Sequence, residues 1–343
     1  MKQRWLISRT DRLGDLLLTL PMGNFIRVHL PEIEPIFLVS SYAAPLVAHH
    51  DPPFQYVIWS HEIDTLRGYD AIIHVFPRNS IAWAALRAKI PRRVGTSRRW
   101  YHWLTCTHRP SVSRRFSGKH EAALNLALLA PLLPSELRPA VQNMTWQDVL
   151  PYRARLRPIA ALPAFIAQAM DSDRLPIILH VGSAGGSPLW KHWQSLALLL
   201  IARFPHALLI FTGGPHEKPF IQAITDNLPK GASLDTAGKL SLDELITLIA
   251  QTALLIAGST GPLHIAAALD TPCIGLFPAT PEMGPWRWRP LTASASVLYT
   301  EVSCSKCSPT NCHCLVLIQP AQVIEQVEMI LSHHLTAPKD LPS

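Results

Sequence analysis

The chain has 343 residues, of which 48% are apolar and 16% charged, and its formal net charge is +7. This composition excludes wholesale disorder, and the length exceeds what one core of ordinary size holds. The leucine-rich beginning is interrupted by Asp11 and Asp15, so we expect neither a signal peptide nor a membrane-spanning helix and predict a cytoplasmic chain.

The first half of the chain alternates short apolar strands with helical stretches. This rhythm predicts a parallel sheet covered by helices. The predicted strands are residues 4–8, 33–40, 56–59, 70–76 and 92–96, and the predicted helices are residues 16–31, 81–90 and 121–133.

A polar loop, RTDRLGD (residues 9–15), separates the first predicted strand from the first predicted helix. Such a loop opens at the carboxyl edge of a parallel sheet, where open α/β folds keep their ligands. Asp15 lies in it, with Asp11 as a second candidate carboxylate. A simpler interpretation is that Asp15 only caps the helix.

Basic residues accumulate between Ala71 and His120, which hold eleven Lys or Arg and no Asp or Glu. The block predicts an anionic partner: nucleic acid, a phosphorylated substrate or an acidic membrane surface. The alternative is that these residues only form a solvated basic face. Aromatic residues in RRWYHW (98–103) suit a membrane interface or stacking on sugars or bases. The candidate binding arginines are Arg92, Arg93, Arg98 and Arg99.

Residues 134–176 are rich in proline and weakly periodic, and they predict an interdomain linker. A second series of alternations follows. Its predicted strands are residues 176–182, 207–214, 234–235, 254–258 and 272–277, and its predicted helices are residues 191–204, 219–228, 240–252 and 262–270. The prediction is an α/β protein of two Rossmann-like domains, residues 1–160 and 161–343. Their parallel sheets would face a central cleft, which is the GT-B architecture.

Three loops of the second half follow predicted strands and precede helices. HVGSAGGSPLWKHW (180–193) offers Ser183, Ser187 and Lys191. Small residues let backbone N–H groups approach a phosphate, a helix N-terminus adds partial positive charge, and the lysine adds a full charge. We therefore expect this loop to bind a diphosphate, although glycine-rich loops are often only turns.

The other two loops repeat the pattern. GSTGPLH (258–264) places Thr260 and the N–H of Gly261 at a helix start, with His264 one turn in. Taken alone, His264 is better explained by capping or packing than by catalysis. In FTGGPHE (211–217), Glu217 is suited to accept hydrogen bonds from ribose hydroxyls, or to complement a helix dipole.

Four of these motifs together resemble glycosyltransferase family 9, the ADP-heptose:lipopolysaccharide heptosyltransferases. They are RLGDLLLTLP, the Lys-His-Trp of WKHW, GGPHE and STGPLHIAAAL, in this order. The resemblance extends from about residue 4 to residue 315. It implies an inverting GT-B enzyme that transfers heptose from ADP-heptose to the lipopolysaccharide inner core.

The resemblance also implies roles for individual residues. Asp15 would be the general base, Lys191 with the backbone of Thr260 and Gly261 would neutralise the departing diphosphate, and Glu217 would hold the ribose. His264 would sit near the diphosphate or the sugar. No cofactor or divalent metal is expected, and the match of DSD (171–173) to a metal-binding pattern is treated as coincidence.

Ser259 departs from the family pattern, which often has aspartate there to contact the donor sugar. Serine cannot supply a charged acceptor, so the sugar is less determined than the nucleotide. Transfer from another nucleotide sugar therefore stays open, as does a non-catalytic glycan- or lipid-binding role on a GT-B scaffold.

The resemblance gives the basic block a partner, an anionic lipopolysaccharide acceptor anchored in the inner membrane. The chain would then be a cytoplasmic monomer in peripheral contact with that membrane. No nucleic-acid-binding module accompanies the block, so we expect no nucleic-acid partner.

Four of the six cysteines lie in CSKCSPTNCHC (304–314). The segment resembles a cysteine-rich element of some family members. Cys304, Cys307, Cys312 and Cys314 are enough for a tetrahedral zinc site, but reduced thiols or a disulfide remain alternatives.

Overall fold

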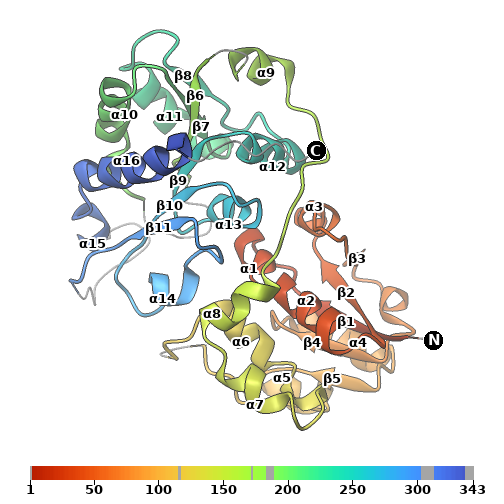
Figure 1. Cartoon of the computed structure of the whole chain (residues 1–343). Coiled ribbons are helices and arrows are strands. Elements are labelled where there is room, and N and C mark those ends of the chain that lie inside the picture. The colour runs from red at the N-terminus through yellow and green to blue at the C-terminus, as the bar shows by residue number, and fades with distance from the viewer. Residues whose placement is uncertain (1, 115–116, 171–172, 183–188, 303–312, 337–343) are drawn as a thin grey trace. The chain divides into compact units, whose positions relative to one another are not determined.

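The computed structural model describes residues 2–114, 117–170, 173–182, 189–302 and 313–336 (Figure 1). The chain forms two compact units, which divide between Arg157 and Pro158. Each unit is an α/β structure built on one parallel sheet. Within the described part of the chain, no helix combines the length and the hydropathy needed to cross a bilayer.

The N-terminal unit contains a five-stranded sheet in the order β3-β2-β1-β4-β5, with every neighbouring pair parallel. The strands are β1 (Gln3–Ser8), β2 (Ile33–Val39), β3 (Gln55–Ile58), β4 (Ala71–His74) and β5 (Arg92–Val94). The helices are α1 (Leu13–Leu17), α2 (Leu20–His29), α3 (Ala44–Ala48), α4 (Asn79–Arg87), α5 (Trp100–Thr105), α6 (Glu121–Ala127), α7 (Arg138–Asn143) and α8 (Trp146–Val149). Because all five strands run parallel, their carboxyl ends share one edge of the sheet.

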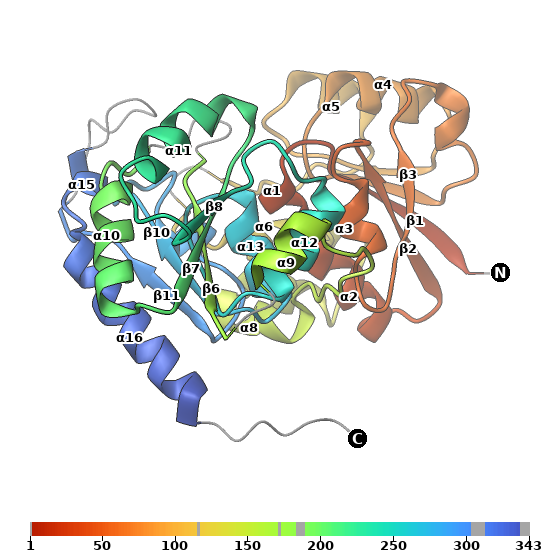
Figure 2. The ribbon, with the colours of Figure 1, turned by 90° about the horizontal axis from the view of Figure 1, so that it is seen from above.

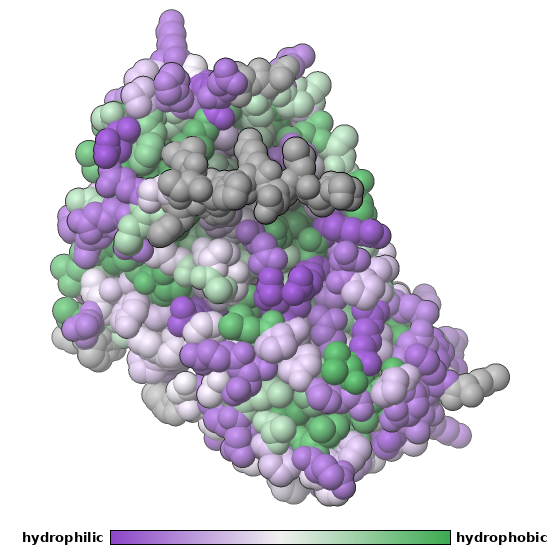
Figure 3. All heavy atoms as spheres, viewed as in Figure 1, coloured by the Kyte–Doolittle hydropathy of each residue, from purple (hydrophilic) through white to green (hydrophobic). Residues whose placement is uncertain are grey.

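Helices cover both faces of this sheet. Ile81 of α4 packs with Leu6 and Ile36 on one face. On the other face α2 approaches so closely that a Cβ at Gly23 would lie 2.9 Å from the ring of Phe37. Figure 2 shows α4 and α5 on one side of the strands and α2 on the other. In Figure 3 hydrophilic and hydrophobic residues are interspersed on the visible exterior, as expected when the apolar sheet faces are covered.

The helix predicted over residues 16–31 is wrong as one element, because α1 ends at Leu17 and α2 begins at Leu20. Pro21 has no N–H to donate to the carbonyl of Leu17, so a continuous helix would lose that hydrogen bond. Within the predicted helix, Leu16, Leu17, Leu20, Phe25 and Val28 recur at roughly helical spacing, but Val28 is 65% exposed.

The linker predicted over residues 134–176 was also too long. The segment contains α7, α8 and α9 (Ala164–Met170). Pro139 lies in the first turn of α7, where proline is tolerated, and Thr145 and Asp148 form a capping box for α8. Pro139 therefore marks the start of a helix, whereas residues 153–163, where the two units divide, contain no helix and no strand.

The C-terminal unit contains a six-stranded parallel sheet in the order β11-β10-β9-β6-β7-β8. The strands are β6 (Leu175–His180), β7 (Ala207–Thr212), β8 (Ser233–Asp235), β9 (Leu254–Gly258), β10 (Cys273–Leu276) and β11 (Ala295–Leu298). Besides α9, the helices are α10 (Trp193–Arg203), α11 (Lys218–Thr225), α12 (Leu242–Ala250), α13 (Gly261–Ala268), α14 (Pro285–Trp288), α15 (His313–Val316) and α16 (Pro320–Thr336). One sheet face packs against α10 and α16 through an apolar core that includes Trp193, Leu196 and Val323.

Candidate functional site

Two carboxylates lie just beyond the carboxyl end of β1. Asp11 lies at a bend in the loop after the strand, and Asp15 lies in the first turn of α1. The residue at the N-cap of α1 is Arg12, and no side chain caps that helix. Asp15 therefore does not occupy the capping position that the simpler interpretation gave it.

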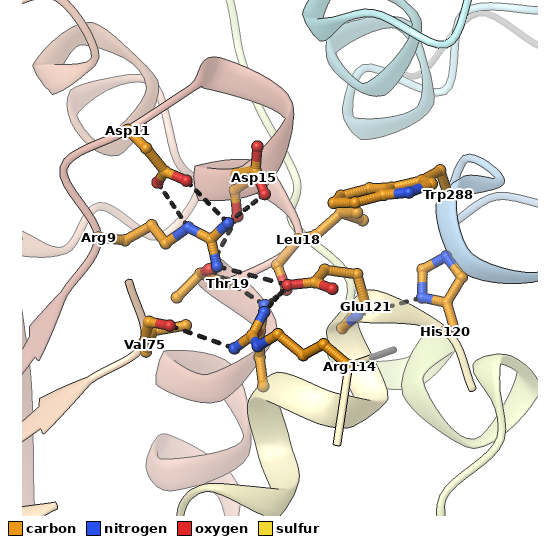
Figure 4. Close-up of polar contacts among 12 residues, drawn as sticks. Arg9, Asp11, Asp15, Leu18, Thr19, Val75, Arg114, His120, Glu121 and Trp288 are labelled. Atoms are coloured by element: carbon orange, nitrogen blue, oxygen red, sulfur yellow. Dashed lines mark hydrogen bonds and ion pairs between the residues drawn. The ribbon is translucent and has the colours of Figure 1, made fainter. Parts of the chain in front are cut away.

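Arg9 holds both carboxylates. Its Nε donates to Asp11 Oδ1 at 2.7 Å and its Nη2 donates to Asp11 Oδ2 at 3.0 Å, while Nη2 also donates to Asp15 Oδ1 (Figure 4). The Arg9 side chain is only 3% exposed, whereas those of Asp11 and Asp15 are 14% exposed. A buried guanidinium thus presents Asp15 at the edge of the sheet. The second oxygen of Asp15 points away from Arg9 in Figure 4.

A second ion pair lies behind the first. Glu121, at the start of α6, is 1% exposed and pairs with Arg114, and its Oε1 is 3.5 Å from Arg9 Nη1. Arg114 Nη2 also donates to Val75 O at 3.2 Å and to Asn125 Oδ1 at 2.9 Å. The network therefore connects the loop after β1, the end of β4 and helix α6.

Asn125 and Thr19 complete the support of α1. Asn125 Nδ2 donates to Leu18 O at 2.9 Å and to Thr19 Oγ1 at 3.2 Å, and Thr19 Oγ1 donates to Asp15 O at 2.8 Å. The backbone of Asp15 is therefore linked to α6 through Thr19, while its side chain is held by Arg9. Preorganised support of this kind is what a reacting carboxylate needs.

Burial raises the pKa of Asp11 above its usual value, and the charge of neighbouring Asp15 raises it further, while Arg9 opposes both effects. The two carboxylates are thus in electrostatic contact through one guanidinium. The two carboxylates differ in the support of their backbone, because only Asp15 belongs to a helix that is hydrogen-bonded to α6 through Thr19.

The four candidate arginines occupy two kinds of environment. Arg92 and Arg93 lie in β5 and are half-buried. Arg92 Nη2 donates to Gln3 Oε1 at 2.6 Å, and Arg93 Nε donates to Thr105 O at 2.5 Å. Arg98 and Arg99 follow the carboxyl end of β5 and are exposed. Arg98 and Arg99 thus lie beyond the same sheet edge as Asp15. The side chains of Arg92 and Arg93 instead make hydrogen bonds with neighbouring residues of the protein.

In the C-terminal unit, His180 at the end of β6 and Glu217 in the loop after β7 both lie near Gly182. A Cβ at Gly182 would lie 3.0 Å from His180 Nε2 and 3.8 Å from Glu217 Cδ, and a Cβ at Gly214 would lie 3.0 Å from Glu217 Oε2. The glycines therefore leave room for the carboxylate. Glu217 is also the N-cap residue of α11 but makes no capping hydrogen bond with its side chain.

His180 is buried and its Nδ1 hydrogen-bonds with Thr212 Oγ1 at 2.9 Å. Burial lowers the pKa of His180 to about 4, so the imidazole is neutral at pH 7.

The loop after β9 leads straight into α13. Thr260 is the N-cap residue, in an extended conformation, and Gly261 is the first helical residue. Thr260 and His264 are buried and Ser259 is half-buried. The first-turn N–H groups of a helix have no intrahelical acceptor, and with the helix dipole they favour an anion.

Lys191 lies two residues before α10, and its side chain is exposed. The residues on either side are anchored: Trp190 Nε1 donates to Ile318 O at 3.0 Å, and His192 Nε2 donates to Val316 O at 3.0 Å. Trp190 and Trp193 pack edge to face with centroids 5.1 Å apart. The buried aromatic pair fixes the backbone that presents the lysine.

Several predicted residues lie outside the described residues. They are Ser183, Ser187, Cys304, Cys307 and Cys312. Cys314 is buried, and its Sγ accepts a hydrogen bond from Ala279 N at 3.3 Å. Within the described ranges, no three His, Cys, Asp or Glu side chains are grouped so as to hold a metal ion.

The sequence interpretation missed Arg9, Arg114 and Glu121 as parts of the site. One signal was available, because Glu121 is the first acidic residue after the acid-free block of residues 71–120. A carboxylate in that position is a natural partner for a buried arginine. Glu121, however, lies 112 positions after Arg9, so this pairing cannot be assigned from the spacing of the residues in the sequence.

One family model and several known proteins match most of this chain. The family model described as "Glycosyltransferase family 9 (heptosyltransferase)" matches residues 64–316. A "Putative glycosyltransferase" of Haemophilus influenzae is 26% identical over 306 residues, covering 84% of this chain and 86% of that protein. "Lipopolysaccharide heptosyltransferase 3" of Escherichia coli is 24% identical and covers 94% of this chain and 98% of its own.

The fold matches solved structures over nearly the whole chain. The structure of Escherichia coli ADP-heptose lps heptosyltransferase II superimposes with a TM-score of 0.76 at 18% identity, covering 97% of this chain and 100% of that one. Together with the two parallel α/β units, this likeness identifies the GT-B fold.

Proposed function

This chain belongs to glycosyltransferase family 9, and we propose that its reaction is the inverting transfer of heptose from ADP-L-glycero-D-manno-heptose to the lipopolysaccharide core. Two similarities support the substrate: a lipopolysaccharide heptosyltransferase of Escherichia coli aligns along almost its full length, and an ADP-heptose enzyme shares the fold. The observation that carries the proposal is Asp15, held at the sheet edge by a buried arginine.

Asp15 acts as the general base in the proposed reaction. Its carboxylate accepts the proton of the acceptor hydroxyl as that oxygen attacks the anomeric carbon of the donor. The bond between this carbon and the diphosphate oxygen breaks, and ADP leaves with the electron pair. Arg9 fixes Oδ1 of Asp15, so the other oxygen is the proposed proton acceptor. Attack opposite the leaving group inverts the configuration.

The C-terminal unit binds the donor in this proposal. Lys191 and the backbone N–H groups of Thr260 and Gly261, at the start of α13, stabilise negative charge on the departing diphosphate. Glu217 accepts hydrogen bonds from the ribose, and its room beside Gly182 and Gly214 supports this role. Ser183, Ser187, Ser259 and His264 are proposed to complete the donor site.

No divalent metal is proposed for the reaction. A lysine and helix N–H groups supply positive charge where other enzymes place a cation. The proposal is testable directly, because transfer should be insensitive to a chelator.

The acceptor is proposed to be anionic and lipid-anchored. Arg98 and Arg99 are exposed beyond the sheet edge that also holds Asp15, and Arg92 and Arg93 extend the basic segment. The chain would work as a monomer on the cytoplasmic face of the inner membrane, in peripheral contact with it. Its partners would then be a nucleotide sugar and a glycolipid, without nucleic acid.

A different nucleotide sugar is the second candidate donor, and Ser259 is the residue that supports this alternative. A serine at this position offers a neutral hydroxyl where many relatives offer a carboxylate to the sugar. A non-catalytic glycan- or lipid-binding protein on the same scaffold is the third candidate, and the supported position of Asp15 argues against it.

The decisive experiment compares ADP-heptose with other nucleotide sugars on truncated lipopolysaccharides. We expect turnover with ADP-heptose, and we expect Asp15→Asn to lower kcat by about 10²-fold to 10⁴-fold, because an amide cannot take up the proton. The donor residues belong to the other unit, so the affinity for ADP should be unchanged.

Asp64→Asn is the matched control, since Asp64 is an exposed carboxylate of the same unit that pairs with the exposed Arg67. It should behave as the wild type. Full activity of Asp15→Asn, with an intact fold, would remove Asp15 from the mechanism. Release of ADP from no donor at all would favour the non-catalytic alternative.

A further inference from the structure

Three of the most exposed large apolar side chains lie on the short helix α5. Trp100 is 69% exposed, Trp103 is 60% exposed and Leu104 is 62% exposed. Their spacing of three and four residues places them on one side of the helix. The opposite side is buried through Tyr101, His102 and Thr105. A six-residue helix thus directs two indoles and a leucine into solvent.

The buried side of α5 is locked onto its own unit. A Cβ at Gly95 would lie 2.6 Å from His102 Nδ1 and 2.7 Å from Cys106 Sγ, so the helix rests directly on the backbone after β5. His102 Nδ1 donates to Thr96 O at 3.0 Å, and its ring stacks on His74 with centroids 5.6 Å apart. The apolar side of α5 is therefore held outward and cannot turn into the core.

Positive charge surrounds this exposed face. Arg98 and Arg99 precede α5 and are exposed, and the guanidinium of Arg109 lies 4.8 Å from the centroid of the Trp103 ring. Trp103 Nε1 donates to Ser97 O at 3.0 Å, which orients the indole. No acidic residue occurs between Ala71 and His120 to neutralise these charges locally.

We propose that α5 and its three flanking arginines form a docking element for an anionic lipid surface. Indoles prefer the membrane–water interface, where an apolar ring and a polar N–H are both accommodated. Arginines beside them attract acidic headgroups. A short amphipathic helix with this composition lies in the plane of the interface.

The composition favours lipid over other occupants of the same face. Leu104 shares the face with the indoles. An aliphatic side chain has no ring on which a sugar or base can stack, whereas it gains free energy when it enters acyl chains. A second copy of the chain would bring its own arginines against these, which is repulsive in a symmetric contact.

Docking itself does not depend on the donor or on catalysis. Its benefit, which is to hold the enzyme where a lipid-anchored acceptor is found, rests on the proposed function. Lipid binding and sugar transfer can therefore be measured separately, and a failure of either can be told from a failure of the other.

The test is co-sedimentation of the full chain with vesicles, without substrates. Vesicles of phosphatidylglycerol and phosphatidylethanolamine should bind the wild type, and phosphatidylcholine vesicles should bind it more weakly. The double variant Trp100→Ser/Trp103→Ser should weaken binding by at least about tenfold. Arg98→Gln/Arg99→Gln should weaken it by about 25-fold at low salt, from about fivefold for each charge, and less at high salt.

The controls are matched substitutions on the other unit. Leu198→Ser/Leu199→Ser removes two exposed leucines of α10, which are 44% and 43% exposed, and Lys230→Gln removes an exposed charge. Both should bind vesicles as the wild type does. Wild-type affinity of the tryptophan variant for anionic vesicles, or equal binding of the wild type to phosphatidylcholine, would overturn the proposal.

Transfer assays then separate lipid from sugar recognition. The tryptophan variant should be impaired on acceptor embedded in vesicles and should match the wild type on a lipid-free acceptor oligosaccharide. Equal losses on both acceptors would show that α5 contacts the saccharide and would overturn lipid docking. Variant-sensitive vesicle binding without transfer from any donor would support docking and reject the proposed function.

Discussion

Arg9 is the side chain on which the geometry of the N-terminal site depends. It is nearly buried, and each of its three guanidinium nitrogens faces a different carboxylate. Nε pairs with Asp11, Nη2 with Asp15 and Nη1 with Glu121. A planar fork can satisfy several carboxylates at once, which a lysine ammonium on a flexible stem cannot do in the same geometry. Arg9 is therefore a positioning residue for Asp15.

The variant Arg9→Lys tests this role at the residue scale. It keeps the charge but loses the fork, so Asp15 should shift, and a displacement of about 1 Å lowers turnover by up to about 100-fold. We expect kcat to fall by about tenfold to 100-fold with an unchanged KM for the donor. The free energy of unfolding should fall by about 1–3 kcal/mol because buried hydrogen bonds are lost. Steady-state kinetics and urea unfolding measure the two effects.

Arg12→Lys provides the control, because Arg12 is a neighbouring exposed arginine outside the network. Its kcat and stability should stay at the wild-type values. If Arg9→Lys retained full kcat, or if only stability changed, Arg9 would be a structural residue without influence on the position of Asp15.

Among the elements, α5 shows how a small residue determines the placement of a helix. Gly95 lies between β5 and α5, and no side chain fits there because His102 and Cys106 occupy the space. Burial raises the pKa of the Cys106 thiol to about 11, so the contact is with a neutral, apolar group. The close approach of backbone to helix is the reason for glycine at this position.

Gly95→Ala should therefore destabilise the protein by about 1–3 kcal/mol, the usual cost of overpacking. Chemical denaturation gives the free energy, and hydrogen exchange should show faster exchange for the amides of α5 than in the wild type. Gly258→Ala is the comparison, since a Cβ there would meet nothing closer than Leu276 O at 4.0 Å. Equal stabilities of the two variants would mean that α5 adjusts freely.

The elements also show where sequence patterns were sufficient. All ten strands predicted from apolar runs occur within a few residues of their predicted bounds, from β1 to β10. Helix bounds were less accurate where proline decided them: Pro21 divides α1 from α2, and Pro139 begins α7 inside the predicted linker. The strand β11 and the helices α3, α5, α14, α15 and α16 were not predicted. All of them except the 17-residue α16 are short and carry weak periodicity.

At the scale of the whole molecule, buried histidines make stability depend on pH. Burial lowers the pKa of His50 and His180 to about 4 and that of His74 to about 3. The unfolded chain takes up protons on these groups below about pH 6.5, while the folded chain does not until far lower pH. Proton uptake therefore favours unfolding, and stability is lost as pH falls from 6.5 toward 4, in both units.

His74→Leu tests this linkage. Both ring nitrogens of His74 are buried and lack a hydrogen-bond partner in the described structure, so an apolar side chain of similar size should be tolerated. Between pH 7 and pH 5 the variant should lose about 2 kcal/mol less unfolding free energy than the wild type. Urea unfolding at the two pH values measures the difference.

Exposed His216 supplies the control, and His216→Leu should retain the pH dependence of the wild type. An identical pH dependence for His74→Leu would show that His74 contributes nothing to acid sensitivity.

The sequence by itself determined the alternation of strands and helices and the position of Asp15 after the first strand. These follow from the spacing of apolar residues and from loop chemistry, which act over a few residues. It could not determine that Glu121 approaches Arg9, or that His102 of α5 stacks on His74 at the end of β4. Those contacts depend on the strand order β3-β2-β1-β4-β5, which brings together residues far apart in the chain, and only the tertiary structure decides which charges become buried together.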